Sequence, residues 1–438
     1  MENHFRYNFK ELIIMKYSFP YKNPGISEVT FPKDMDVTVY RVPEVEGVDL
    51  GSDEIVRKSL SEPIGKPELR KMLKKDDQIL LIIDDISRPT PIRDFIDTII
   101  DEIQQVGIED ENIEFLIALG THRFMTDEEC VKKLGQTIYD RFAVYNHEWN
   151  NPDALHDFGK LDDGTRVILN KKIAESDLVI GIGSIAPHPA AGFSGGAKII
   201  VPGAGTDDAA GNFHWESIMH PQKEVLGVRD NPMREMIDSI STKAGFDYIV
   251  NVIMDGSNKV VDAVSGDPIE AHKVGANKAL EIFGVKIKSP QNYDIFIIDT
   301  HPLDQELWQG VKALCALETI IPDGAIGIIV SPLPEGICQS HPQVSENGFL
   351  PFEKVKPLVE SGKISKIVGH NLVQGGRLLE HTKGYLVSPG VDEKQANQMG
   401  FEYFSDIQSA VDAAIEVKGH DAKIMVLGMG GEIAPIIN

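Results

Sequence analysis

Short apolar runs alternate along the chain with stretches of helical periodicity, and this pattern is typical of an α/β protein. The apolar runs have the length of buried strands and lie between segments whose apolar residues recur at helical spacing. We expect strands at residues 78–83, 113–119, 177–182, 250–254, 294–298, 325–330 and 423–427.

Helix signals lie between these runs. Residues 91–106 have helical periodicity, with Pro91 at the start and Gly107 after the end, the residue types preferred at those positions. Thr126 and Glu129 have the spacing of a capping box and predict the start of another helix. Further helices are expected at residues 307–320 and 406–417.

The length of the chain predicts two domains, because 438 residues exceed what one hydrophobic core usually serves. Residues 284–291, GVKIKSPQ, are small, polar and proline-containing, and we interpret them as the linker. We therefore expect an N-terminal α/β domain at residues 1–286 and a C-terminal α/β domain at residues 287–421. The last strand could belong to either domain, so residues 422–438 could rejoin the first.

Polar residues follow several of the expected strands directly. Asp85 and Arg88 come after the strand at 78–83, and His122 comes after the strand at 113–119. Open α/β sheets bind ligands beyond the carboxyl ends of their strands. We therefore expect these side chains and the segment after Ile182 at one edge of a sheet.

The charge balance excludes some classes of partner. The chain has 43 basic and 67 acidic residues, a net charge of −24. Such a surface repels nucleic-acid phosphates and anionic membranes, so neither is an expected partner. An anionic small substrate would need a locally basic pocket.

Three further features favour a reducing cytoplasm. Residues 1–19 contain no uninterrupted apolar region and no small-residue cleavage site of a secretory signal. No apolar run reaches the roughly 18 residues of a membrane span. Cys130, Cys315 and Cys338 are odd in number and not closely spaced, which predicts neither a disulfide framework nor a thiolate metal cluster.

The segment 183–215 is glycine-rich, with apolar anchors such as Phe193 and Trp215, and it predicts an ordered ligand-binding loop. Within it, Ser194, Gly195 and Gly196 resemble a phosphate cradle, in which backbone N–H groups turn toward one anion. Lys198 follows, and a lysine in an apolar pocket can act as a nucleophile or covalent tether. The alternative is an ordinary solvated lysine.

Three histidines lie in or near these loops: His122, His188 and His214. Neutral imidazole suits both nickel coordination and proton transfer near neutral pH. Their spacing matches no conventional zinc motif.

Other polar residues leave two interpretations open. Arg88 could bind a carboxylate or phosphate, with Asp85 orienting a cationic group, or the two could form an ordinary surface pair at a capping turn. Gln309 and Lys312 lie three residues apart on an expected helix and share a face. By themselves they would be solvated helix residues.

Together these segments resemble the nickel-pincer lactate racemase family. The resemblance extends over most of the chain, in matching order and separation. Its pieces are DDISRPTP (84–91), ALGTHRFMTDEE (118–129), YNHEWNNP (145–152), HPAAGFSGGAKIIVPG (188–203), FHW (213–215) and DQELWQGVKAL (304–314).

The resemblance implies two α/β domains with an interdomain active-site cleft and a role for each candidate residue. Lys198 would carry the cofactor, a nickel-pincer nucleotide (a pyridinium-3-thioamide-5-thiocarboxylic acid mononucleotide), near Asp85, Arg88, Ser194, Gly195 and Gly196. His214 would be the protein ligand to nickel, and His122 and His188 the paired proton acceptor and donor. Arg88, Gln309 and Lys312 would bind the substrate.

The implied activity is racemisation or epimerisation of lactate or a related 2-hydroxy acid, by reversible hydride transfer through a transient 2-keto acid. Cofactor-assembly enzymes would be partners. The family's late tryptophan near the substrate is absent, since no tryptophan follows Trp308. This departure indicates a different pocket wall against the substrate's side chain. A non-catalytic nickel-cofactor-binding protein and a zinc hydrolase built on the three histidines are the alternatives.

Overall fold

The computed structural model describes residues 16–437, and it forms two compact units. Unit 1 contains the described residues up to Glu44, Ile282–Val355 and the described residues from Asn371 onward. Unit 2 contains Val45–Glu281 and Lys356–His370. The first 15 residues, part of the segment in which no secretory signal was expected, lie outside the described residues. In the described part of the chain, no helix combines the length and the apolar character that crossing a membrane requires.

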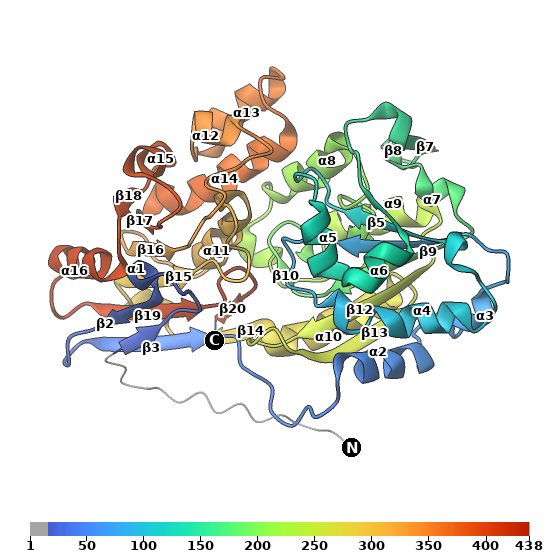
Figure 1. Ribbon diagram of the computed structural model, residues 1–438. Helices are drawn as coiled ribbons and strands as arrows, with labels where there is room; N and C mark the ends of the chain where they lie inside the picture. The colour runs from blue at the N-terminus through green and yellow to red at the C-terminus, as the bar shows by residue number, and fades with distance from the viewer. Residues whose placement is uncertain (1–15, 438) are drawn as a thin grey trace. The chain divides into compact units, whose positions relative to one another are not determined.

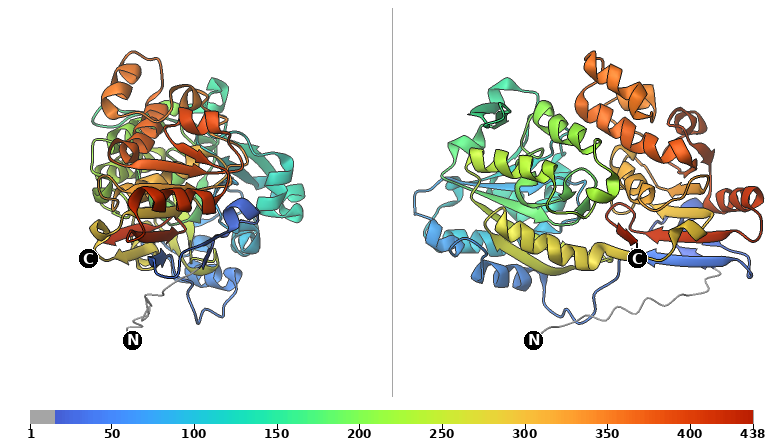
Figure 2. Two further views of the ribbon diagram at one scale, coloured as in Figure 1. Left: turned by 90° about the vertical axis from the view of Figure 1, so that its left-hand side faces the viewer. Right: turned by 180° about the vertical axis from the view of Figure 1, so that it is seen from behind.

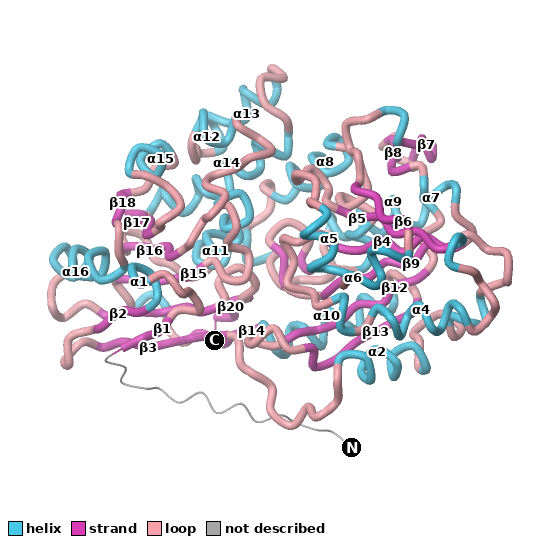
Figure 3. Tube along the Cα trace, viewed as in Figure 1, coloured by secondary structure: helices cyan, strands magenta, loops and turns pink. Residues whose placement is uncertain are grey.

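Unit 2 is built on a six-stranded sheet of order β13-β12-β9-β4-β5-β6. The strands from β12 to β6 run parallel, and β13 is antiparallel at one edge. They lie side by side in Figure 3. Their bounds are β4 (Ile79–Asp84), β5 (Ile113–Ala118), β6 (Ala143–Asn146), β9 (Leu178–Ser184), β12 (Tyr248–Met254) and β13 (Val260–Gly266).

Helices cover both faces of this sheet, which explains why its central strands are apolar throughout. Figure 1 shows α2, α4, α5 and α6 on one side, and Figure 2, seen from behind, shows α9 and α10 on the other. The helices of unit 2 are α2 (Ser52–Ser61), α3 (Leu69–Met72), α4 (Ile96–Gln104), α5 (Asp127–Leu134), α6 (Gln136–Arg141), α7 (Lys172–Glu175), α8 (Asp207–Ser217), α9 (Pro232–Ala244) and α10 (Glu270–Phe283).

Two short hairpins complete unit 2. They are β7 (Leu155–Lys160) with β8 (Arg166–Asn170), and β10 (Pro187–His188) with β11 (Gly192–Phe193). The second hairpin lies within the glycine-rich segment that follows β9, so that segment is ordered, as expected.

Unit 1 contains a second six-stranded sheet, of order β18-β17-β16-β15-β19-β3, and all of its pairings are parallel. Its strands are β3 (Asp36–Arg41), β15 (Ile295–Asp299), β16 (Ile326–Val330), β17 (Lys383–Val387), β18 (Glu402–Phe404) and β19 (Lys423–Gly428). Two smaller sheets pair β1 (Lys16–Ser18) with β2 (Glu28–Thr30) and β14 (Gly284–Ile287) with β20 (Ala434–Ile437).

The helices associated with unit 1 include the expected ones at 307–320 and 406–417. They are α1 (Pro24–Ser27), α11 (Leu307–Glu318), α12 (Gln343–Asn347), α13 (Phe352–Glu360), α14 (Lys366–His381), α15 (Glu393–Gln398) and α16 (Ile407–Lys418). Parts of α13 and α14 belong to unit 2, because residues 356–370 cluster with it.

The α/β class is confirmed, and every strand expected from the apolar runs is present. Two local predictions differ from the structure. Residues 284–287, interpreted as linker, form β14, because their backbone pairs in parallel with β20. The N-terminal end also differs from the expected division, because β3 pairs along its whole length with β19 in the unit 1 sheet. The last strand, β19, which was left open between the two domains, belongs to unit 1.

Candidate functional site

Two adjacent carboxylates end the buried strand β4, and each has its own cationic partner. Asp84 lies 2.6 Å from the amine of Lys133, a residue of α5 whose side chain is 3% exposed. The Thr90 hydroxyl donates to Asp84 at 2.5 Å and lies 2.9 Å from the Ser184 hydroxyl. Lys133 also donates to the carbonyls of Asp85 and Arg88. Lys133 therefore fixes the turn that carries the expected site residues.

Asp85 is paired with His122 from the loop after β5. Asp85 Oδ2 lies 2.6 Å from His122 Nδ1, and its other oxygen accepts from Ser87. Burial alone would raise the pKa of Asp85, but the charge and hydrogen bond of His122, together with Arg88 and Ser87, hold it well below its ordinary value. An ionised carboxylate only accepts hydrogen bonds, so Nδ1 of His122 carries the proton and Nε2 is the basic atom of the neutral ring.

This pairing confirms that the residues after β4 and β5 meet at one sheet edge, because the two strands are parallel neighbours. It also shows that Asp85, which is 5% exposed, is not half of an ordinary surface pair.

His188 is buried on the β10–β11 hairpin in the opposite tautomeric state. The backbone N–H of Ala190 donates to His188 Nδ1 at 3.1 Å, so this nitrogen is an acceptor. The neutral ring then carries its proton on Nε2. In their neutral forms, His122 and His188 thus differ in which ring nitrogen carries the proton.

His214 is buried on α8 and its ring is oriented by its own helix. Its Nδ1 lies 2.7 Å from the carbonyl oxygen of Ala210, one turn earlier. That oxygen accepts, so Nδ1 is the protonated atom and Nε2 bears the lone pair that a metal ligand needs. The rings of His188 and His370 lie 6.2 and 4.8 Å from that of His214, centroid to centroid.

Lys198 lies on a short 3₁₀ helix, Gly196–Ile199, and is partly exposed. Desolvation of its amine, and then the positive charges of Arg88 and Arg234, lower the pKa of Lys198 well below the ordinary value, with Asp85 opposing. This environment favours the neutral, nucleophilic amine over a solvated ammonium group.

The Ser194–Gly196 turn differs from the expected phosphate cradle. The N–H groups of Ser194 and Gly196 donate to the carbonyl of Ala186 and to Oδ1 of Asn251, at 2.8 and 2.7 Å. The Ser194 hydroxyl bonds to the backbone of Ser184 and Ala186. Two cradle donors are therefore used inside the protein, and the glycines serve the backbone path, with φ of 72° at Gly195 and 58° at Gly196.

Gln309 and Lys312 lie on α11 in unit 1 and are both buried. The Lys312 amine donates to Gln309 Oε1 at 2.9 Å, which confirms that they share a face and excludes the interpretation as solvated residues. The other candidate residues belong to unit 2.

Sequence reasoning missed several residues that position the site. Lys133 had a usable signal, because it follows buried Cys130 by three residues on the apolar face of α5. Asn251, Arg234 and His370 carry no such signal, since their partners lie far away in the sequence. Among residues 16–437, no group of three or more His, Cys, Asp or Glu side chains is placed to hold a metal ion, so a zinc site made by His122, His188 and His214 is not supported.

Comparisons with known proteins agree with this architecture. Residues 23–226 match the lactate racemase N-terminal domain, and residues 289–434 match the lactate racemase C-terminal domain. Lactate racemases from Thermoanaerobacterium thermosaccharolyticum and Lactiplantibacillus plantarum are each 29% identical, over 393 and 390 residues, 87% of this chain and 90% of theirs.

Solved structures extend the similarity to three dimensions. The lactate racemase apoprotein from T. thermosaccharolyticum matches with a TM-score of 0.83 at 27% identity, over 97% of this chain and all of that one. A Thermotoga maritima protein shares the fold, with a TM-score of 0.73 at 22% identity over 90% of this chain and all of its own. The domain and sequence matches identify this chain as a racemase, and racemases are isomerases. The chain belongs to the lactate racemase family.

The buried Lys133–Asp84 pair gives a test of the site's framework. We predict that Lys133→Met lowers the free energy of unfolding by about 3–5 kcal/mol, because a buried carboxylate loses its partner. Lys132→Met, at the exposed neighbouring position, is the matched control and should have little effect. Chemical denaturation measures both.

The loss of unfolding free energy in Lys133→Met should also depend on pH. Burial raises the pKa of Asp84, opposed by Lys133 and Thr90, and losing Lys133 raises it further. The folded state of Lys133→Met then binds this proton more tightly than the unfolded state, so its stability falls as the pH rises. The deficit should be smaller at acid pH than at neutral pH; equal stability of the two lysine variants would contradict the assignment.

Proposed function

We propose that this protein is a nickel-dependent racemase or epimerase of a 2-hydroxy acid, with a nickel-pincer nucleotide attached to Lys198. The observation that carries the proposal is the pairing of His122 with Asp85, which leaves Nε2 of His122 as a base, together with the second buried imidazole, His188, held by a backbone N–H. A racemase must remove a hydroxyl proton from one enantiomer and return one to form the other. The lactate racemases among its relatives support the reaction class.

The residues present fit such a cofactor. Lys198 offers a nucleophilic amine for covalent attachment, and His214 offers Nε2 to nickel. Asp85 and Arg88 would lie against the cofactor, with Ser194, Gly195 and Gly196 shaping the backbone next to it. When bound, the cofactor supplies an electron-poor pyridinium ring that takes up and returns the hydride of the substrate's Cα.

The two histidines perform the proton chemistry. As hydride leaves Cα, the substrate hydroxyl loses its proton to Nε2 of His122, and a planar 2-keto acid remains. As hydride returns to the other face, the imidazolium form of His188 gives the proton on Nε2 to the keto oxygen and is left as a neutral ring. The rings end with exchanged protonation states, from which the reverse reaction starts. Asp85 stabilises the protonated His122 that forms in the first step.

Substrate and partners follow from the same proposal. Arg88 supplies a fixed cation with the fork geometry that suits a substrate carboxylate. The substrate-binding role of Gln309 and Lys312 stays a prediction from the family resemblance. Enzymes that assemble and insert the cofactor are the expected protein partners, and a cytoplasmic location follows if assembly takes place there.

Covalent attachment gives the first test. Protein coexpressed with cofactor-assembly enzymes should show an adduct in intact mass spectrometry, and peptide mapping should place it on Lys198. Lys198→Ala should carry none, and Lys171→Ala, at an exposed position, should be loaded like the wild type. An adduct that persists in Lys198→Ala would contradict the attachment site.

The acid–base pair gives the second test. His122→Gln and His188→Gln should each lower the rate of interconversion by about 10²–10⁴. Chiral chromatography of a panel of 2-hydroxy acids, including lactate, measures the rate in both directions. His156→Gln, at an exposed position, is the control. Full activity in both test variants would contradict the roles, and a loaded wild type that interconverts no acid would favour a cofactor-binding protein.

A further inference from the structure

Three consecutive backbone carbonyls before Lys198 are held by buried side chains from the other side of the loop. Arg234 on α9 donates to the carbonyl oxygens of Phe193 and, at 3.4 Å, of Gly195. His272 on α10 lies 2.9 Å, through Nε2, from the carbonyl oxygen of Ser194 between them. Arg234 and His272 are both fully buried.

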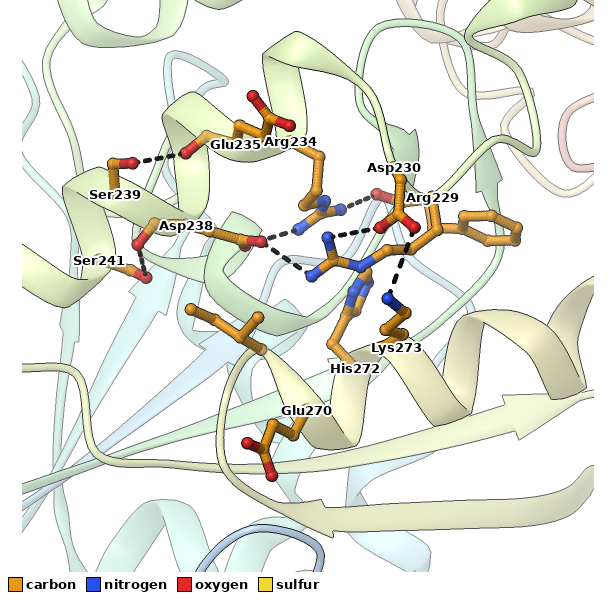
Figure 4. Close-up of polar contacts among 12 residues, drawn as sticks. Arg229, Asp230, Arg234, Glu235, Asp238, Ser239, Ser241, Glu270, His272 and Lys273 are labelled. Carbon is orange, nitrogen blue, oxygen red and sulfur yellow. Dashed lines mark hydrogen bonds and ion pairs between the residues drawn. The ribbon is translucent and has the colours of Figure 1, made fainter.

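Arg234 is the largest fully buried side chain in the described structure, and burying its charge is costly. Its carboxylate partner, Asp238, lies 4.0 Å away and is shared with Arg229, which approaches it at 2.8 Å. Figure 4 shows the two guanidinium groups meeting Asp238, with His272 beside them. The closest contact of Arg234 is with the carbonyl oxygen of Phe193. Its buried charge therefore binds the loop rather than Asp238.

His272 is a neutral donor. The Ser194 oxygen only accepts, so Nε2 carries the proton. Burial, and then the positive charges of Arg234 and Arg229, lower the pKa of His272 well below its ordinary value. The ring also lies close to the backbone of Gly196, because a Cβ added at this position would be only 2.7 Å from the ring of His272. A glycine is therefore required there.

We propose that Arg234 and His272 form a clamp on Phe193–Gly196 that positions Lys198 for covalent attachment of its cofactor. This inference rests on the proposed function of Lys198. Neither residue was identified from the sequence, and both act through the loop rather than on the substrate.

The clamp reaches Lys198 through geometry and charge. The Gly195 carbonyl that Arg234 holds also accepts from the backbone N–H of Lys198, at 3.3 Å. The first turn of the 3₁₀ helix is therefore hydrogen-bonded to a carbonyl group that Arg234 also binds. Desolvation is the largest influence that lowers the pKa of the Lys198 amine, followed by the charges of Arg88 and Arg234, while Asp85 acts in the opposite direction. The clamp thus supplies one of the two fixed cations that favour the neutral amine.

The reactivity of Lys198 in the full-length, unloaded protein tests the charge effect. Competitive labelling with acetic anhydride over a pH series, read by peptide mass spectrometry, gives the pH of half-maximal labelling. Arg234→Met should raise this midpoint by about one unit, because a positive charge is lost. Arg234→Lys, which keeps the charge, should shift it less. Arg229→Met, which loses a charge bound to the same Asp238, is the matched control and should shift it less than Arg234→Met.

Amide hydrogen exchange tests the geometry. His272→Phe keeps a ring but removes the donor, and should speed deuterium uptake in the peptide around Phe193–Lys198 about tenfold, as expected for one lost hydrogen bond. His272→Gln keeps an N–H donor and should restore slow uptake. Peptides from α4, on the other face of the sheet, provide the internal reference.

The outcomes separate this inference from the proposed function. An unchanged midpoint in folded Arg234→Met, or an equal shift in Arg229→Met, would overturn the charge role, and unchanged exchange in His272→Phe would overturn the clamp. If Arg234→Met fails to fold, Arg234→Lys and the two His272 variants decide. Absence of an adduct on Lys198 in loaded wild type would instead contradict the proposed function, and the labelling and exchange results would still decide whether the loop is clamped.

Discussion

The site depends on the placement of two adjacent carboxylates at the end of a strand buried on both faces. Successive side chains of a strand point to opposite sides, so Asp84 and Asp85 need separate partners. Lys133 neutralises Asp84 and holds the following turn, while His122 pairs with Asp85. If either partner were absent, a charge would be left buried and uncompensated.

This constraint determines the tautomer of His122, and a backbone contact determines that of His188. An ionised Asp85 keeps the proton of His122 on Nδ1, whereas a backbone N–H directed at His188 keeps its proton on Nε2. The two neutral rings thus differ in the nitrogen atom that bears the lone pair. The backbone around the second ring is in turn continuous with the glycine-rich loop that carries Lys198.

Much of the fold could be predicted because strand burial is a local property. The run at residues 78–83 gave β4 within one residue, and the Thr126–Glu129 capping box is present, with both of its hydrogen bonds. The pairing of β3 with β19 could not be predicted, since it joins segments nearly 400 residues apart. Residues 284–287 looked like linker because their strand has only one partner, β20.

The site shows the same limit. The meeting of Asp85 and His122 followed from parallel strands with polar ends, and the shared face of Gln309 and Lys312 followed from helical spacing. The phosphate cradle was predicted wrongly, because the sequence could not show that Asn251 and the Ala186 carbonyl already accept hydrogen bonds from the loop's N–H groups.

The most direct measurement is the hydrogen position on the imidazole rings of His122 and His188, by neutron diffraction at neutral pH. We expect deuterium on Nδ1 of His122 and on Nε2 of His188. The same tautomer in both rings would contradict the assignment of the two histidines.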